Sequence, residues 1–470
     1  MKHTRILLTA LLLAPLAGTA TEPARAGATS NGDKVTAGRI AIRDGRFVDS
    51  GTGRAFRPFG VNYYRLGPIA ENKHGHSAFS PGTYDEAFIT RMMEELSRSG
   101  FNTVRSFLSI HSGTNGIVTH PQSGEVNPAF LRNLVHFLRA ARTHGIRVIL
   151  SWDIWTPDSR AWAETPLVDE ARHGWVTEPK QELKVNGFRL TPQPIRAKAN
   201  AIRALIGGLR QSAPELLPVV LAWELENEVH FILDQEPFSS RPAAFVFGGR
   251  AFDLGTDSGA QALMDASTRA WATACADAIH AADPEALVSA SVFTFNAVGR
   301  QGPGTWSKDQ TKDARVPARP LALLDTSLDF VDLHLYACKS ETETIAQHLQ
   351  RHLASVEMPL LATEARRLGK PILIGESGVA AHYMRRGPDW QTIPHDIGVN
   401  LLRDFHQALA AQPFDGVLHW HYGSPDSTAN EEYPALYLFP QYGEPLLLAL
   451  KAQETEMIRK TTTIQQREKQ

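Results

Sequence analysis

Eight stretches of the chain combine apolar and β-branched residues in runs of the length expected for buried strands. Helical patterns separate many of them, and the strands begin about every 42 to 45 residues, apart from two intervals near 70. Eight strands that alternate with helices predict an α/β fold closed as a (β/α)8 TIM barrel, with an open doubly wound sheet as the alternative. The predicted strands are residues 57–64, 100–108, 145–155, 218–228, 286–295, 329–337, 371–379 and 415–423.

The clearest helical pattern covers residues 127–145. Asn127 can cap this helix, Pro128 suits its first turn, and Gly145 stands where it should end. Before the barrel, Asp44-Gly45 within residues 39–49 is the pair that favours a tight β-hairpin. Further helices are predicted at residues 85–100, 261–284, 342–356 and 398–411.

Long loops follow the third, fourth and fifth predicted strands, at residues 155–188, 230–259 and 296–319. In a (β/α)8 barrel, such βα loops lie at the C-terminal face, where active sites are built. Each strand except the fifth also ends in polar residues, which the mouth of a barrel would bring together. These residues are Asn62, Arg105, Asp153, Asn227, Glu228, His334, Tyr336, Glu376, His419 and His421.

The stretch "WELENE" at residues 223–228 places three glutamates at every second position. Alternate residues of a strand share a face, so Glu224, Glu226 and Glu228 would crowd one side and repel one another. A nearby group must therefore hold these negative charges, or one of the carboxylates must take up a proton. We expect the other polar residues at the strand ends to provide such a group.

Glu228 and Glu376 end non-adjacent strands and could face each other across the mouth. Two opposed carboxyl groups suit glycoside hydrolysis, in which one is kept protonated by its surroundings and the other attacks the anomeric carbon. Arg105 could keep the attacking carboxylate ionised and Tyr336 could donate a hydrogen bond to it. Trp420, or a tryptophan of the loops, could stack on a sugar ring.

The ordered motifs "WELENE", "HLY", "PILIGESG" and "HWHYG" make residues 39–451 resemble glycoside hydrolase family 5 of clan A. The resemblance implies a retaining β-glycosidase without a cofactor, with Glu228 as acid/base and Glu376 as nucleophile. Endo-β-1,4-mannanases look most similar, and cellulase-like or exo-acting activity stays open. The positions that would bind substrate or support the carboxylates are Arg105, Asn227, His334, Tyr336 and Trp420.

The resemblance also bears on the three glutamates. It implies that the fourth strand bulges or ends near Asn227, which turns Glu226 away as a salt-bridged or solvated carboxylate. Glu224 should then lie deeper, relieved by a neighbouring strand's arginine or by protonation. Two departures from the family pattern weaken the inference of the substrate from other members. Val229 stands where many members have proline, and "VILSWDIW" lacks the histidine that often ends the third strand.

Two other classes of protein fit parts of the pattern. A metal-dependent barrel hydrolase could use His334, His419, His421 and Asp153 as ligands, although hydrogen-bonded cleft histidines are the favoured interpretation and no metal is predicted. A non-catalytic carbohydrate-binding barrel would not need both Glu228 and Glu376. A carbohydrate substrate is the expected partner.

The composition of the chain limits the partners and the kind of scaffold that the protein can have. The chain of 470 residues has a formal net charge of −2 and no block of Lys and Arg, which argues against nucleic acid as a partner. Its two cysteines, Cys275 and Cys338, exclude a disulfide scaffold and are predicted to be free thiols. The sequence does not indicate the oligomeric state.

The first 26 residues have a charged start, a short apolar run and small residues, the order of a secretory signal peptide. The apolar run is too short to span a bilayer, and no later segment looks transmembrane, so a secreted protein without a membrane partner is expected, in the periplasm or the medium. The predicted organisation is a signal peptide (1–26), a linker (27–36), the barrel (37–452) and a polar tail (453–470).

Overall fold

The computed structural model describes residues 38–70, 73–153, 157–167, 170–177, 180–294, 314–337, 340–379, 383–386, 389–392 and 394–423. The predicted signal peptide, most of the linker, the polar tail and Cys338 lie outside these residues, so the domain boundaries stay predictions. Cys275 is a free, fully buried thiol, and burial raises its pKa to about 12.

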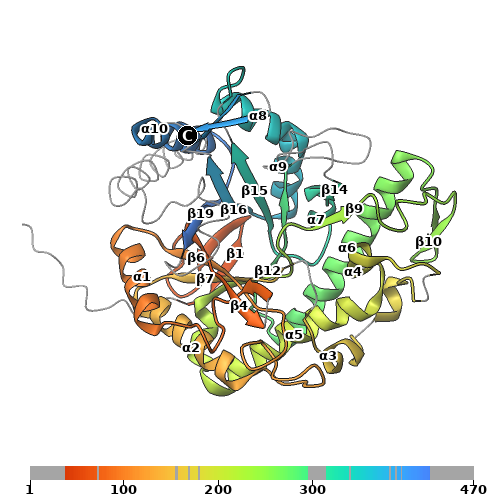
Figure 1. Cartoon of the computed structure of the whole chain (residues 1–470), viewed down its shortest axis with the longest axis horizontal. Coiled ribbons are helices and arrows are strands. Elements are labelled where there is room, and N and C mark those ends of the chain that lie inside the picture. The colour runs from red at the N-terminus through yellow and green to blue at the C-terminus, as the bar shows by residue number, and fades with distance from the viewer. Residues whose placement is uncertain are drawn as a thin grey trace, which may run out of the picture. The chain divides into compact units, whose positions relative to one another are not determined.

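A parallel sheet of nine strands forms the centre of the fold (Figure 1), in the order β12-β8-β7-β6-β3-β19-β16-β15-β13. The strands β12 and β13 are two halves of the predicted fifth strand, separated by Ala290, so the two ends of the order meet and the sheet is nearly closed as a barrel. All eight predicted strands are confirmed. Their bounds are β3 (Phe59–Tyr64), β6 (Thr103–Phe107), β7 (Arg147–Ser151), β8 (Val220–Glu224), β12 (Val288–Ser289), β13 (Ser291–Phe293), β15 (Val331–Ala337), β16 (Ile372–Val379) and β19 (Gly416–Gly423).

Helices surround this sheet (Figure 1), and the five predicted from the sequence are all present. Two long helices were not predicted. The first, α5, contains the pair Gly207-Gly208, which weakens its helical signal; the second, α9, follows α8 directly through Glu357 in the left-handed conformation. The bounds are α1 (Glu86–Arg98), α2 (Pro128–Thr143), α5 (Pro192–Ser212), α6 (Asp257–Ala282), α8 (Ile345–Ser355), α9 (Met358–Leu368) and α10 (His395–Ala410).

The N-terminal end of the barrel is covered by the predicted hairpin, β1 (Ile40–Arg43) and β2 (Arg46–Asp49). Asp44 and Gly45 both have positive φ, as the tight turn requires. Phe47 packs edge-on against Phe330 with ring centroids 5.1 Å apart, beside inward-facing apolar residues of the barrel strands. The opposite, C-terminal end of the barrel therefore carries the mouth.

The long βα loops contain ordered elements of their own. The antiparallel pair β9 and β14 joins the loop after the fourth strand to the loop after the fifth. The other small elements are β4 (Leu66–Ala70), β5 (Lys73–His76), α3 (Arg160–Glu164), α4 (Gly187–Leu190), β9 (His230–Ile232), β10 (Phe245–Phe247), β11 (Arg250–Phe252), β14 (Arg315–Pro317), α7 (Pro320–Leu324), β17 (Tyr383–Arg386), β18 (Asp389–Thr392) and 3-10 turns at Glu170–His173, Lys184–Asn186 and Pro214–Val219.

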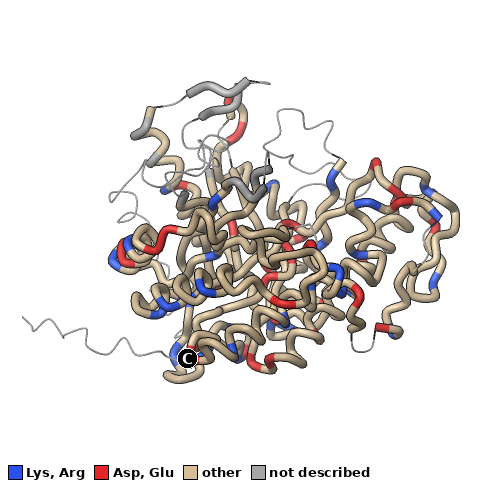
Figure 2. Tube along the Cα trace, turned by 60° about the horizontal axis from the view of Figure 1, so that its bottom comes forward, with Lys and Arg blue, Asp and Glu red and all other residues tan. Residues whose placement is uncertain are grey.

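Positions of Lys and Arg are interspersed with positions of Asp and Glu along the described trace (Figure 2), in keeping with the small net charge. Within the part of the chain that the structure describes, none of the helices has the length and apolar character needed to cross a membrane.

Candidate active site

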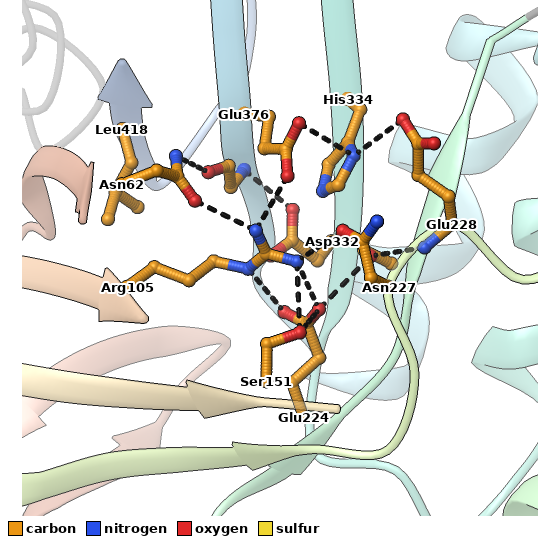
Figure 3. Close-up of polar contacts among 12 residues, drawn as sticks. Asn62, Arg105, Ser151, Glu224, Asn227, Glu228, Asp332, His334, Glu376 and Leu418 are labelled. Carbon is orange, nitrogen blue, oxygen red and sulfur yellow. Dashed lines mark hydrogen bonds and ion pairs between the residues drawn. The ribbon is translucent and has the colours of Figure 1, made fainter. Parts of the chain in front are cut away.

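Arg105 on β6 lies at the centre of the site and is fully buried (Figure 3). Its Nη1 donates to Glu376 Oε1 at 2.7 Å and to Asn62 Oδ1 at 2.8 Å. Its Nε and Nη2 donate to the two oxygens of Glu224 at 3.1 and 2.5 Å, and Nη2 also donates to Asn227 Oδ1 at 2.7 Å. One guanidinium thus holds two carboxylates and two amide side chains.

Glu224 lies deepest in the barrel, and its ion pair with Arg105 balances its negative charge. Burial lowers the pKa of Arg105, but Glu224 and Glu376 outweigh it and the net pKa is raised, so the guanidinium stays charged. Burial raises the pKa of Glu224, whereas Arg105 and a hydrogen bond from Ser151 Oγ at 2.8 Å lower it, and the net shift is downward. The predicted arginine partner is confirmed, but it comes from β6, with β7 lying between the two strands.

Glu376 on β16 accepts a second short hydrogen bond, from the Tyr336 hydroxyl to Oε2 at 2.5 Å. Burial raises its pKa, His334, Arg105 and Tyr336 lower it, and the charge of Glu228 raises it, so that the net shift is upward. Burial and the charge of Glu376 raise the pKa of Tyr336 well above its ordinary value. Tyr336 therefore remains a hydrogen-bond donor to Glu376.

Glu228 faces Glu376 with His334 between them (Figure 3). His334 Nδ1 lies 3.1 Å from Glu228 Oε1 and 3.4 Å from Glu376 Oε2. The backbone of Glu228 has a φ of 56°, in the left-handed region, and its N–H donates to Ser291 Oγ at 2.9 Å. Such a conformation is uncommon for a side chain of this size, and it is held here by surrounding contacts.

His334 shifts the pKa of both glutamates, and both glutamates shift the pKa of His334. Burial raises the pKa of Glu228, but the hydrogen bond and charge of His334 outweigh burial and the net shift is downward. Burial lowers the pKa of His334, and the two glutamates outweigh it in turn, so its net shift is upward. These directions differ from the expectation that the surroundings keep the acid protonated and the nucleophile ionised, because the pKa of Glu228 is lowered and that of Glu376 is raised.

Glu226 points away from Glu224 and Glu228. It is fully buried, forms an ion pair with Arg189 and accepts a hydrogen bond from Lys198 Nζ at 2.7 Å. The expectation of a salt-bridged carboxylate is confirmed and that of a solvated one is not. Burial and the charge of Arg189 lower the pKa of Lys198 to about 7.

An aromatic cluster lies beside the carboxylates. The Trp420 ring is 7% exposed and packs against Tyr64 and Phe107, with centroids 4.6 and 5.9 Å apart. The Arg105 guanidinium carbon lies 4.7 Å from the centre of the Phe107 ring, and His76 of β5 stacks on the same ring at 4.6 Å. Trp420 is therefore part of the wall next to Arg105.

His76 also has a polar contact, 3.1 Å from its Nε2 to Asp153 Oδ2 at the end of the third strand. The third strand lacks the histidine expected from family members, and an imidazole from the β4–β5 hairpin stands at its end instead. Sequence reasoning missed His76 because hairpin and strand are far apart in the chain.

The histidines of the eighth strand do not join this site as a pair. His419 Nδ1 lies 3.2 Å from Ser377 Oγ, and its ring packs 4.1 Å from His406 of α10, on the helix side of the sheet. The prediction that His419 lies at the mouth is wrong. His421 contacts the rings of Tyr64 and Trp420.

A different group has the geometry for a metal ion. Among the described residues, ligand atoms of Glu228, His334 and Glu376 all lie within 4.8 Å of one another. The predicted ligand set is not assembled, since Asp153 pairs with His76 and His419 packs against α10. The same compact group has the two opposed carboxylates that glycoside hydrolysis requires.

Asp332 is another buried residue that sequence reasoning missed. It is fully buried on β15 below His334, and its Oδ1 accepts the Gly375 N–H at 2.6 Å. A signal was present in the sequence, because Asp332, His334 and Tyr336 are polar residues at every second position of one strand.

A (β/α)8 barrel with two carboxylates facing each other at its C-terminal mouth is an arrangement of glycoside hydrolases. Residues 69–392 match the family model described as cellulase (glycosyl hydrolase family 5). The match extends over more than half of the chain, and the chain belongs to glycoside hydrolase family 5.

Solved structures share this fold at low sequence identity. An endo-β-1,4-mannanase from Thermotoga petrophila is 15% identical with a TM-score of 0.53, over 86% of this chain and 77% of that one. An exo-β-1,4-mannosidase from Opitutaceae bacterium strain TAV5 is 19% identical with a TM-score of 0.53, over 89% and 63%. An endo-1,4-β-mannanase from Rhizomucor miehei is 13% identical with a TM-score of 0.54, over 90% and 100%. No curated protein matches the chain in sequence.

Proposed function

We propose that this glycosidase hydrolyses the O-glycosidic bonds of a β-linked polysaccharide or oligosaccharide with retention of configuration. Glu376 is the nucleophile and Glu228 the acid/base. The observation that carries the proposal is the placement of these two carboxyl groups on either side of His334, with oxygens within 4.8 Å of each other. Retaining enzymes separate their carboxyl groups by about 5 to 5.5 Å, and inverting enzymes by about 6.5 to 9.5 Å.

The surrounding residues suit each role in the first step. The Glu376 carboxylate attacks the anomeric carbon while the bond to the leaving oxygen breaks, and Glu228 gives that oxygen its proton. Arg105 and Tyr336 hold the attacking carboxylate through bonds of 2.7 and 2.5 Å. His334, with its Nδ1 3.1 Å from Glu228 Oε1, can pass this proton to Glu228 before the step begins.

The second step reverses these roles. Water attacks the anomeric carbon of the glycosyl ester, loses a proton to Glu228 and releases the Glu376 carboxylate. The positive charge of Arg105 stabilises the carboxylate as it leaves. Asn227, whose side chain accepts from Arg105, is placed next to Glu228 to bind a sugar hydroxyl.

Mannan is the favoured substrate. The three solved structures described above are named as mannanases and a mannosidase, and "LAWELENE" has the same resemblance. Cellulose, other β-glucans and exo-action on short chains are the alternatives within the family. The N-terminal segment supports export as part of the proposal, since such polymers lie outside the cell.

The test measures reducing sugar released from β-mannan, β-glucan and soluble cellulose, with and without chelator. We expect one polymer to be cleaved equally in both conditions. Glu376→Gln should fold and bind sugar but turn over almost nothing, whereas Glu364→Gln, a control at a partly exposed helix position that pairs with Arg367, should match wild type. Wild-type rates for Glu376→Gln would refute the two-glutamate mechanism.

The Glu228→Gln variant tests the acid separately. General acid assistance is typically worth about 10² to 10⁴-fold, and it matters most for poor leaving groups. Activity on the polymer should fall by that factor while an activated aryl glycoside is cleaved in its first step nearly as fast as by wild type. Equal losses on both substrates would contradict the acid role.

Two further classes are distinguished by the same experiment. Loss of activity in chelator would favour a metal-dependent hydrolase at Glu228, His334 and Glu376, the described group with suitable geometry. Sugar binding without any hydrolysis would favour a carbohydrate-binding barrel.

A further inference from the structure

The strand that carries Glu376 is irregular just before this residue. The register between β15 and β16 passes from Leu333–Ile374 to His334–Glu376 and so skips Gly375. A register shift also occurs on the other side, between β16 and β19. Gly375 is the extra residue of a β-bulge, and a bulge re-aims the side chains that follow it.

Both backbone groups of Gly375 bond to side chains. Its N–H donates to Asp332 Oδ1 at 2.6 Å, and its carbonyl accepts from Asn62 Nδ2 at 2.8 Å. Both side chains are fully buried. A buried peptide group outside the regular ladder needs such partners, because leaving its N–H or C=O unpaired away from water is unfavourable.

The glycine itself is required by this contact. A Cβ atom at residue 375 would lie 1.9 Å from Oδ2 and 2.3 Å from Oδ1 of Asp332. The carboxyl group can approach the backbone this closely only because no side chain stands there. The first two residues of "GESG" are thus linked: the glycine admits Asp332, and the next residue is Glu376.

Asn62 contacts two groups that hold Glu376 in place, the Gly375 peptide and the Arg105 guanidinium. Its amide nitrogen bonds to the Gly375 carbonyl, and its Oδ1 accepts from the Arg105 Nη1 that also binds Glu376. The peptide before the carboxylate and the guanidinium that faces it are therefore located by the same side chain.

We propose that Asn62 and Asp332 are positioning residues that aim Glu376 at the anomeric carbon by holding the Gly375 peptide from both sides. This inference rests on the proposed role of Glu376 as nucleophile. A misplacement of about 1 Å in a reacting group costs about 10²-fold in rate.

The first arm of the test compares Asp332→Ala with Asp332→Asn. Alanine removes the acceptor for the Gly375 N–H, and kcat/KM on an activated dinitrophenyl β-glycoside of the sugar released from the polymer should fall by about 10²-fold. Asparagine keeps an oxygen acceptor and should restore a rate close to wild type. Burial and the charge of Glu224 raise the pKa of Asp332, and asparagine has nearly the same size and shape as this carboxyl group.

The second arm separates positioning from folding. In Glu376→Ala, azide can take the place of the missing carboxylate: it attacks the anomeric carbon, the bond to dinitrophenolate breaks, and a glycosyl azide of inverted configuration forms. Adding Asp332→Ala or Asn62→Ala to this variant should leave the azide-dependent rate unchanged, because the side chain that they aim is gone.

The outcomes are distinct. Wild-type rates for Asp332→Ala would overturn the inference, as would an equal loss in the azide reaction, which would indicate a general effect on the barrel or on sugar binding. If Asp332→Ala fails to fold, Asn62→Ala provides the same comparison from the carbonyl side, and unfolding of both would assign these residues to the fold alone. Full activity of Glu376→Ala would instead refute the proposed function.

Discussion

Glu224, Glu226 and Glu228 occupy alternate positions of one segment, yet they enter three different environments. Strand β8 ends at Glu224, so the strict alternation that would crowd them stops there. Glu224 meets Arg105 inside the barrel, Glu226 meets Arg189 and Lys198 outside it, and Glu228 turns into the mouth through its positive φ. Each carboxylate thus has its own cation or imidazole.

Removing the Glu226 charge should destabilise the protein strongly. In Glu226→Gln, Arg189 and Lys198 stay buried without their anion, and breaking a buried ion pair costs about 3 to 5 kcal/mol. The loss should be larger at pH 6 than at pH 8, because Lys198, with a pKa near 7, sheds its charge in that interval.

Urea unfolding of wild type and Glu226→Gln at the two pH values measures this effect. Glu364→Gln removes a surface carboxylate and should change the free energy of unfolding by about 1 kcal/mol or less. A loss as small as that of the control would show that the buried cations find other partners.

Much of the candidate site could be predicted at this scale. Glu228, Glu376, Arg105 and Tyr336 were predicted from strand ends and the residue types that the chemistry needs, and the structure brings them together. Asp332 was not predicted, although it stands two residues before His334 on the same strand, because its importance depends on the bulge at Gly375. Register between strands leaves no mark in the spacing of a single sequence.

At the scale of elements, the last turn of α6 is tied to the sheet by a titratable contact. His280 Nε2 lies 3.0 Å from Asp329 Oδ2, and the same oxygen accepts the Val288 N–H at 2.7 Å. The hydrogen bond with Asp329 raises the pKa of His280 above 6.5. Helix, β12 and the start of β15 meet at this carboxylate.

This contact should make part of the stability depend on pH. A histidine whose pKa is raised in the folded state stabilises fully below its unfolded pKa, near 6.5, and loses this contribution as pH rises through the folded value. We expect His280→Gln to lower the free energy of unfolding by about 1 kcal/mol at pH 5.5 and by less at pH 8.5. A difference that is independent of pH in urea titrations would contradict this role.

Elements were predictable where one local signal was strong. Asn127 accepts the Ala129 N–H and begins α2 as predicted, and Gly145 has the positive φ expected after its end. The helix α5 was missed because tertiary packing of its apolar face, and not local propensity, carries it past Gly207-Gly208.

For the whole molecule, Arg105 joins strands on several sides of the barrel. From β6 it reaches Asn62 on β3, Ser151 on β7, Glu224 on β8 and Glu376 on β16. The barrel interior is therefore held together by a polar centre as well as by apolar packing. The same contacts support the chemistry.

Arg105→Met should reduce stability and activity together. Two carboxylates would remain buried without their cation, at a cost of about 3 to 5 kcal/mol, and Glu376 would lose its main hydrogen-bond donor. Denaturant unfolding and polymer hydrolysis measure the two losses. The control is Arg172→Met, which removes an exposed pair with Asp277 worth about 1 kcal/mol or less. Near-native stability of Arg105→Met would refute the role of this polar centre.

The closed architecture was predicted from the number and spacing of the strands, and the family match agrees with it. The interruption at Ala290 was not predicted, since residues 286–295 have the composition of one uninterrupted strand. The division comes from how the strand meets its two neighbours, which depends on the curvature of the finished barrel.

That interruption has a consequence for how the barrel opens. β12 pairs with β8 only through Val288–Trp223 and Ser289–Glu224, and β13 pairs with β15 only over Ser291–Phe293, whereas β6 and β7 pair along their whole length. Partial unfolding follows the path that breaks the fewest hydrogen bonds. We therefore expect the fifth strand to be the seam of the cylinder: its amides should exchange for deuterium before those of β6 and β7, and an open sheet edge should form there first on heating.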